Sequence, residues 1–153
     1  GLFAVIMLAA LLMIIFGWRA ATPEFVYAPP PGLRHPAMLL VVIAFIFFAA
    51  SHSKNSRIKH IVRHPQLVSV LIWAVAHLMA NGDSRSVALF GTMAVWSIIS
   101  IIFINLRDGT KPALEQPNPW WREGLVVVIG VVLATIVVKF HQYLAGIALM
   151  PTS

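Results

Sequence analysis

The sequence predicts an all-α fold: a polytopic transmembrane helical bundle with about five spans, forming one domain over residues 1–153. Hydrophobic residues make up 59% of the chain and charged residues only 10%, whereas a soluble domain is about half apolar and a quarter charged. A chain this small cannot bury so much apolar surface in an aqueous core. The apolar residues also gather in five runs, most of them close to the roughly 17–25 residues that cross a bilayer.

The predicted spans cover residues 2–18, 36–52, 66–81, 87–106 and 124–146. Trp18 and Arg19 give the first span an ending typical of a membrane interface. Pro36 and Pro65 suit the first helical turn of the second and third spans. The chain begins at Gly1 inside an apolar run, so we expect one further span upstream of it.

Proline, glycine and polar residues mark the breaks between the spans. The segment 22–36 contains five prolines and cannot be helical throughout. The tripeptide "NGD" at 81–83 predicts a turn or a helix end, with Gly82 able to adopt the left-handed conformation. The segment 107–123 is a polar loop that ends in a tryptophan pair, as expected at a membrane interface.

The positive charges lie between the apolar runs, which predicts membrane flanks and argues against binding to nucleic acid. Seven Lys and Arg residues fall in segments 51–66 and 107–123, against three in 19–36 and 82–86. The positive-inside rule therefore predicts that the first two segments lie on the cytoplasmic side of a bacterial inner membrane. The sequence has no cysteine, so neither a disulfide nor a thiolate site is available.

The six histidines fall into two groups. Three lie in the basic segment 51–66 and are interpreted as loop residues that face solvent or lipid headgroups, with a lipid-phosphate patch as the alternative. The other three belong to separate spans and approach the same, outer leaflet: His35, His77 and His141.

The third span carries a polar stripe with a period of four residues, which drifts only about 40° per step around a helix. The stripe consists of Ser69, Trp73, His77 and Asn81. The fourth span carries a similar stripe of Thr92, Trp96 and Ser100. Because lipid offers polar groups no hydrogen-bond partner, we expect the two stripes to face each other.

His77 has two interpretations from the residues alone. Its imidazole can join helices by a hydrogen bond to a neighbouring span, or it can be an axial ligand of haem b held between helices. His35 and His141 compete as the second ligand, and Trp73 and Asn81 lie beside His77 on the stripe. The small residues at 74, 76 and 80 suit either a macrocycle or close helix packing.

Four segments resemble the NnrU family of bacterial membrane proteins over nearly the whole chain. They are "RHPQLVSVLIWAVAHLMANGD" (63–83), "LRHPAMLL" (33–40), "INLRDG" (104–109) and "HQYLAGIALM" (141–150). The family is associated with denitrification and nitric oxide metabolism and is related to the haem-containing 15-cis-zeta-carotene isomerase. The resemblance implies His77 as first candidate haem ligand and His35 as second. Family members usually carry a further N-terminal histidine, which would be an alternative partner.

Three functions follow from these resemblances. The first is a haem-binding accessory protein or a subunit of a larger membrane complex or homo-oligomer in nitrogen-oxide or respiratory redox metabolism. The second is a haem-dependent isomerase that acts on a hydrophobic polyene. The third rests on "RHP" at 63–65, which is similar to the S-adenosylmethionine site of membrane methyltransferases, although the loop 107–123 lacks the acidic motif of those enzymes.

Overall fold

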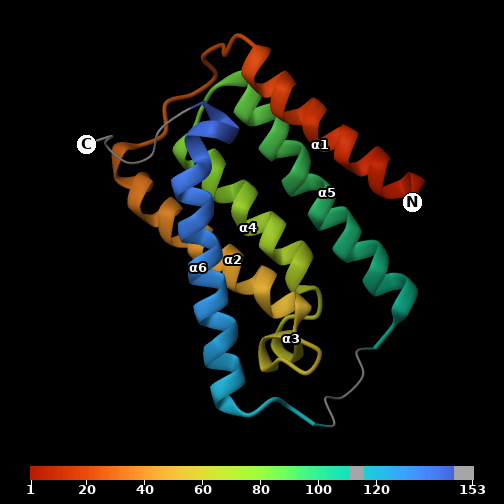
Figure 1. Ribbon diagram of the computed structural model, residues 1–153. Helices are drawn as coiled ribbons and strands as arrows, with labels where there is room; N and C mark the ends of the chain where they lie inside the picture. The colour runs from red at the N-terminus through yellow and green to blue at the C-terminus, as the bar shows by residue number, and fades with distance from the viewer. Residues whose placement is uncertain (111–115, 147–153) are drawn as a thin grey trace.

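The computed structural model describes residues 1–110 and 116–146, and these are mostly helical (Figure 1). The elements are α1 (Leu2–Ala20), the short 3-10 helix η1 (Pro31–Leu33), α2 (Arg34–His52), α3 (Arg57–Ile61), α4 (Pro65–Ala80), α5 (Ser84–Asp108) and α6 (Trp120–Ala145). Within the described residues no strand forms, and the one isolated bridge joins Phe25 to Asp83. The all-α prediction is confirmed.

The five long helices coincide with the five predicted spans to within about four residues at each end. Four of them, α1, α2, α5 and α6, are long and apolar enough to cross a membrane. The fifth, α4, has 16 residues and a length of about 24 Å, somewhat less than the roughly 30 Å of a hydrocarbon core. It lies inside the bundle, where α2 and α5 pack against it (Figure 1).

Small side chains make the contacts between α2, α4 and α6. The buried apolar residues are mostly alanines: Ala37, Ala44, Ala50, Ala74, Ala76 and Ala134, together with Phe90 and Val126. Where α6 crosses α2, a Cβ added to Gly130 would lie 2.6 Å from the Cα of Ile46. Helices without large side chains at their contact approach closely, as is usual in membranes.

Helix α1 is attached to the bundle by its last turn. None of its residues is buried, and Figure 1 shows its N-terminal end pointing away from α2, α4 and α6. At its C-terminal end the Trp18 indole donates to the Ala145 carbonyl at 3.2 Å, and the Arg19 guanidinium donates to the Tyr143 carbonyl at 3.2 Å. The two contacts join the end of α1 to the end of α6.

A proline-rich strap, residues 22–30, crosses the end of α4 and the start of α5. The Tyr27 hydroxyl donates to the carbonyls of Leu78 and Asn81, and the backbone N–H groups of Val26 and Tyr27 donate to the Gly82 carbonyl at 3.0 Å. Gly82 itself departs from the prediction, because the described residues with positive φ are Gly109 and Gly146. Glycine is needed at 82 for another reason: an added Cβ would lie 1.8 Å from the Tyr27 carbonyl oxygen.

A second polar cluster, which the sequence did not predict, joins the opposite end of the bundle. The buried Glu123 carboxylate on α6 accepts hydrogen bonds from the Ser56 hydroxyl at 2.9 Å and the Arg57 backbone N–H at 3.0 Å. Asn118 donates to the Ser53 hydroxyl at 2.9 Å. Because a buried carboxylate needs such donors, this cluster fixes the start of α6 against α3.

A candidate cofactor-binding cavity

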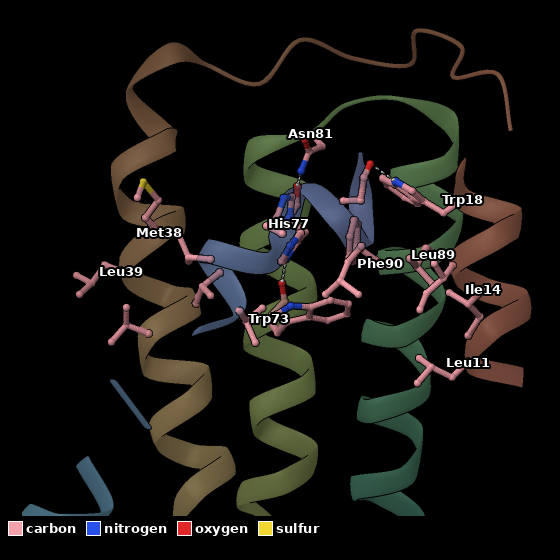
Figure 2. A pocket seen from close by; sticks show the side chains of 18 residues that line it. Leu11, Ile14, Trp18, Met38, Leu39, Trp73, His77, Asn81, Leu89 and Phe90 are labelled. Carbon is pink, nitrogen blue, oxygen red and sulfur yellow. Dashed lines mark hydrogen bonds between the residues drawn. The ribbon is translucent and has the colours of Figure 1, made fainter. Parts of the chain in front are cut away.

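A cavity of about 580 Å³ lies at the end of the bundle that the strap covers. Side chains of 18 residues from α1, α2, α4, α5 and α6 line it (Figure 2). Most of them are apolar, including Ile14, Met38 and Leu89. Cofactor sites in proteins enclose roughly 300–1,000 Å³ and combine apolar walls with a few placed polar groups. The size and lining of this cavity fit that description.

His77 presents one imidazole nitrogen from α4, in a fixed orientation. Its Nδ1 lies 2.8 Å from the Trp73 carbonyl oxygen. A carbonyl only accepts hydrogen bonds, so Nδ1 carries the proton in the neutral ring and Nε2 keeps its lone pair. The Phe90 ring stacks on the imidazole with 4.3 Å between ring centres. Such a hydrogen bond at the far nitrogen is how proteins orient metal-binding histidines.

Trp73 and Asn81 flank His77 on the same face of α4 (Figure 2). The Trp73 ring centre lies 4.7 Å from that of His77, and the Asn81 side chain donates to the His77 carbonyl at 3.0 Å. The hydrogen bonds therefore stay within α4 instead of joining a neighbouring span. Ser69, the fourth member of the predicted stripe, is buried and is not one of the residues that line the cavity.

His141 on α6 lies beside His77. Their ring centres are 6.5 Å apart and the rings are nearly parallel, with 22° between their planes. His35 is exposed and does not line the cavity. The structure thus brings together two of the three histidines predicted to meet at this end.

The spacing of the two imidazoles is close to that of a pair that shares one metal ion. A metal ion between two imidazoles separates their ring centres by roughly 6 Å, because each metal–nitrogen bond is about 2 Å and each ring centre lies about 1 Å further out. Within the described chain no three His, Cys, Asp or Glu side chains form a metal-binding group.

The predicted facing stripe on α5 is wrong. Thr92 is exposed and Trp96 is 51% exposed, while Ser86, Phe90 and Ser97 are buried. Phe90 contacts His77 and also lies edge-on to Trp73, with 4.9 Å between ring centres. The buried face is visible in the sequence as small polar residues at 86 and 97 around Phe90, but their spacing alone did not distinguish it from the stripe at 92, 96 and 100.

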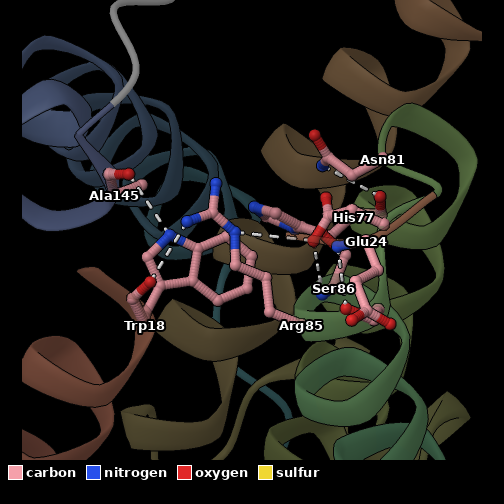
Figure 3. Close-up of polar contacts among 9 residues, drawn as sticks. Trp18, Glu24, His77, Asn81, Arg85, Ser86 and Ala145 are labelled. Atoms are coloured by element: carbon pink, nitrogen blue, oxygen red, sulfur yellow. Dashed lines mark hydrogen bonds and ion pairs between the residues drawn. The ribbon is translucent and has the colours of Figure 1, made fainter. Parts of the chain in front are cut away.

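At the outer rim of the cavity Arg85 lies over the Trp18 ring, 4.5 Å from its centre (Figure 3). Its Nη1 donates to the Trp18 carbonyl at 3.1 Å. The neighbouring Asp83 caps α5 by accepting from the Ser86 N–H at 3.0 Å and the Ser86 hydroxyl at 2.7 Å. Partial burial raises the pKa of Asp83, but these hydrogen bonds and the charge of Arg85 outweigh it and hold the pKa below its ordinary value.

The family model described as NnrU protein matches residues 1–149. The chain belongs to the NnrU family. No curated protein and no solved structure matched the chain. The family match and the four long apolar helices together indicate that this NnrU chain is a multi-pass membrane protein.

The "RHP" motif of this NnrU chain joins the start of α4 to the end of α5. The Arg63 guanidinium donates to the Gly109 carbonyl, and His64 Nε2 lies 2.9 Å from the Asn105 side-chain oxygen. The "HQYLAGIALM" segment is partly visible: residues 147–150 lie outside the described part of the chain, whereas His141 lines the cavity.

Proposed function

We propose that this NnrU protein binds haem b in the cavity, with His77 and His141 as its axial ligands. The observation that carries the proposal is a pair of imidazoles with ring centres 6.5 Å apart in the wall of a mainly apolar cavity of about 580 Å³. The wall suits the apolar faces of a macrocycle, and the hydrogen bond to Trp73 leaves His77 Nε2 ready to coordinate. His35, the second ligand that the resemblance implied, lies outside the cavity lining.

The proposed role is that of an accessory protein or subunit in denitrification, nitric oxide or respiratory redox metabolism of a bacterial inner membrane. Haem supplies one-electron chemistry and binding of small gases such as nitric oxide. The chain contributes the orientation of two imidazoles and a wall that keeps water away. Aromatic side chains, Trp73, Phe90 and Trp18, line the same cavity.

The visible absorbance spectrum of the protein, purified in detergent after haem-supplemented expression, tests this proposal. We expect a Soret band, and we expect His77→Ala and His141→Ala each to weaken or shift it. His52→Ala is the matched control, because His52 lies at the other end of α2 and is exposed. A His35→Ala variant separates the two possible ligand pairs and should leave the spectrum unchanged. Wild-type protein without a Soret band contradicts the proposal.

A haem-dependent isomerase of a hydrophobic polyene is the second candidate. It is favoured by the apolar side chains that both line the cavity and are exposed on the outside of the bundle, among them Leu11, Met38 and Leu39. A substrate dissolved in lipid could reach the cavity past these side chains. Conversion of an added cis-polyene by the haem-loaded protein would favour this candidate, and its absence would favour the accessory role. The methyltransferase alternative rests on Arg63 and His64, whose side chains contact the Gly109 carbonyl after α5 and the Asn105 side chain on α5.

A further inference from the structure

We infer that Arg85 forms a carboxylate-binding subsite at the outer rim of the cavity. It would bind the acidic group of an amphiphilic ligand whose apolar body occupies the cavity. The inference rests on the proposed function in that it takes the cavity as a ligand site, and it adds the chemical class of ligand that the rim selects.

The first observation is an unsatisfied donor. The Arg85 side chain is only 20% exposed, and its buried Nε has no hydrogen-bond partner in the described part of the protein. A buried guanidinium is costly unless it is paired and its N–H groups are bound. Arg85 therefore retains binding capacity that the described chain does not use.

The second observation is that the neighbouring carboxylate is already engaged. Asp83 Oδ1 lies 3.5 Å from Arg85 Nε, too far for a charge-assisted hydrogen bond of about 2.7–2.9 Å. Both Asp83 oxygens accept from Ser86 and hold the cap of α5. Asp83 thus compensates part of the charge of Arg85 without forming a hydrogen bond to Nε, and Nη1 is engaged by the Trp18 carbonyl. A second carboxylate would complete the pairing of the guanidinium that Asp83 leaves unfinished.

The third observation is the position of Arg85 relative to the cavity. Its guanidinium lies over Trp18 (Figure 3), which lines the cavity. Leu89, one turn further along α5, lines it too. Arg19 follows Trp18 at the same rim and is exposed. Neither arginine is among the residues that line the cavity, and Arg85 contacts its wall through Trp18. Two cations beside the wall match a ligand whose apolar body occupies the cavity and whose one or two carboxylates reach its edge.

Two sources share this chemistry: the propionates of haem, and the carboxylate of a fatty acid from the bilayer. A binding experiment with esterified ligands distinguishes them. Haem and haem dimethyl ester are titrated into the detergent-purified full chain, and binding is followed by absorbance. We expect wild-type protein to bind haem about tenfold or more tightly than the ester, the loss expected for one charge-assisted hydrogen bond.

Arg85→Gln should reduce this preference to less than about threefold, and Arg85→Lys, which keeps the charge but not the fork, should give an intermediate value. Arg107→Gln is the matched control, because Arg107 is an exposed arginine at the other end of α5. If Arg85→Gln does not fold, the acid and ester comparison on wild-type protein still decides. Equal binding of acid and ester by wild-type protein overturns the inference while leaving the haem site intact.

If neither haem nor its ester binds, the proposed function fails. A second titration, with a fatty acid, then tests the inference about Arg85. A fluorescent fatty acid and its methyl ester are then titrated into the same proteins. A preference for the acid that Arg85→Gln removes supports the subsite with a fatty acid as the source. Binding of neither, or of both equally, overturns the inference.

Discussion

The two turns of backbone from Trp73 to Asn81 prepare the His77 imidazole for a ligand. The Trp73 carbonyl fixes which nitrogen carries the proton, and Asn81 occupies the His77 carbonyl, so both polar groups are satisfied within one helix. The side chains of His77 and Asn81 therefore find their hydrogen-bond partners in the backbone of their own segment. The free side of the His77 imidazole faces the cavity, where His141 approaches from α6.

Asp83 gives a residue-scale prediction that depends on pH. Its folded pKa lies below its ordinary value of 3.8, so its stabilising contribution is complete above that value and is lost as the pH falls through the lower, folded pKa. Asp83→Ala should lower the free energy of unfolding by about 1 kcal/mol at neutral pH through the lost cap. The difference from wild type should shrink below about pH 4.

Unfolding of the detergent-solubilised protein at pH 7 and pH 3 measures this difference. Asp83→Asn is the control, because asparagine also caps helices but carries no charge, so its own contribution should not vary with pH. An Asp83→Ala deficit that is equal at both pH values would contradict the role of the carboxylate.

The residues of the site could be predicted only in part. Trp73, His77 and Asn81 were found because they share one face of one helix, which periodicity reveals. The choice between His35 and His141 could not be made, because it depends on how far the α2 end and the α6 end lie from α4. Phe90 was missed for the same reason: the sequence shows that α5 has a polar stripe but not which face turns inward.

At the scale of the elements, hydropathy predicted where the five long helices lie but neither the short helices α3 and η1 nor what joins the elements. The strap depends on Tyr27 reaching carbonyls more than fifty residues away, and the Glu123 cluster depends on that carboxylate meeting the start of α3. Neither contact leaves a local pattern in the sequence. Gly82 illustrates the difference, because its importance was predicted for a left-handed turn and lies in the close approach of the strap.

The crossing of α2 and α6 gives a prediction at this scale. Gly130→Ala would place a methyl group 2.6 Å from the Cα of Ile46, a backbone atom that cannot rotate aside. We expect the free energy of unfolding to fall by about 1–3 kcal/mol, as for other overpacked contacts. Gly124→Ala on the same helix is the control, because a Cβ there meets nothing within 4 Å, and alanine favours a helix by about 0.5–1 kcal/mol. Equal stability of the two variants would show that the crossing tolerates separation.

At the scale of the whole molecule, the two ends differ in what they hold. One end has the cavity, the strap and Arg85, and the opposite end has the Glu123 cluster and most of the described cations. Lys111, one of the seven cations that set the predicted orientation, lies outside the described residues. The positive-inside rule predicts that the Glu123 end faces the cytoplasm.

Single cysteines test this orientation cleanly, because the chain has none of its own. Thr22→Cys in the strap and Lys54→Cys near α3 are both exposed positions at opposite ends. A maleimide that cannot cross membranes should label Thr22→Cys in spheroplasts and should label Lys54→Cys only after detergent is added. The reverse pattern would invert the protein in the membrane, and labelling of both from outside would mean that α2 does not span it.

Because α1 is attached by one end, the surrounding lipid can change the shape of the cavity by tilting this helix. Its 19 residues extend for about 28 Å, and Leu11 and Ile14 form part of the cavity wall beyond the anchor at Trp18 and Arg19. A helix fixed at one end answers a thinner bilayer by tilting about that end. Bilayer thickness would then set the distance between α1 and the rest of the cavity wall. Ligand exchange should therefore be faster in short-chain lipids than in long-chain ones.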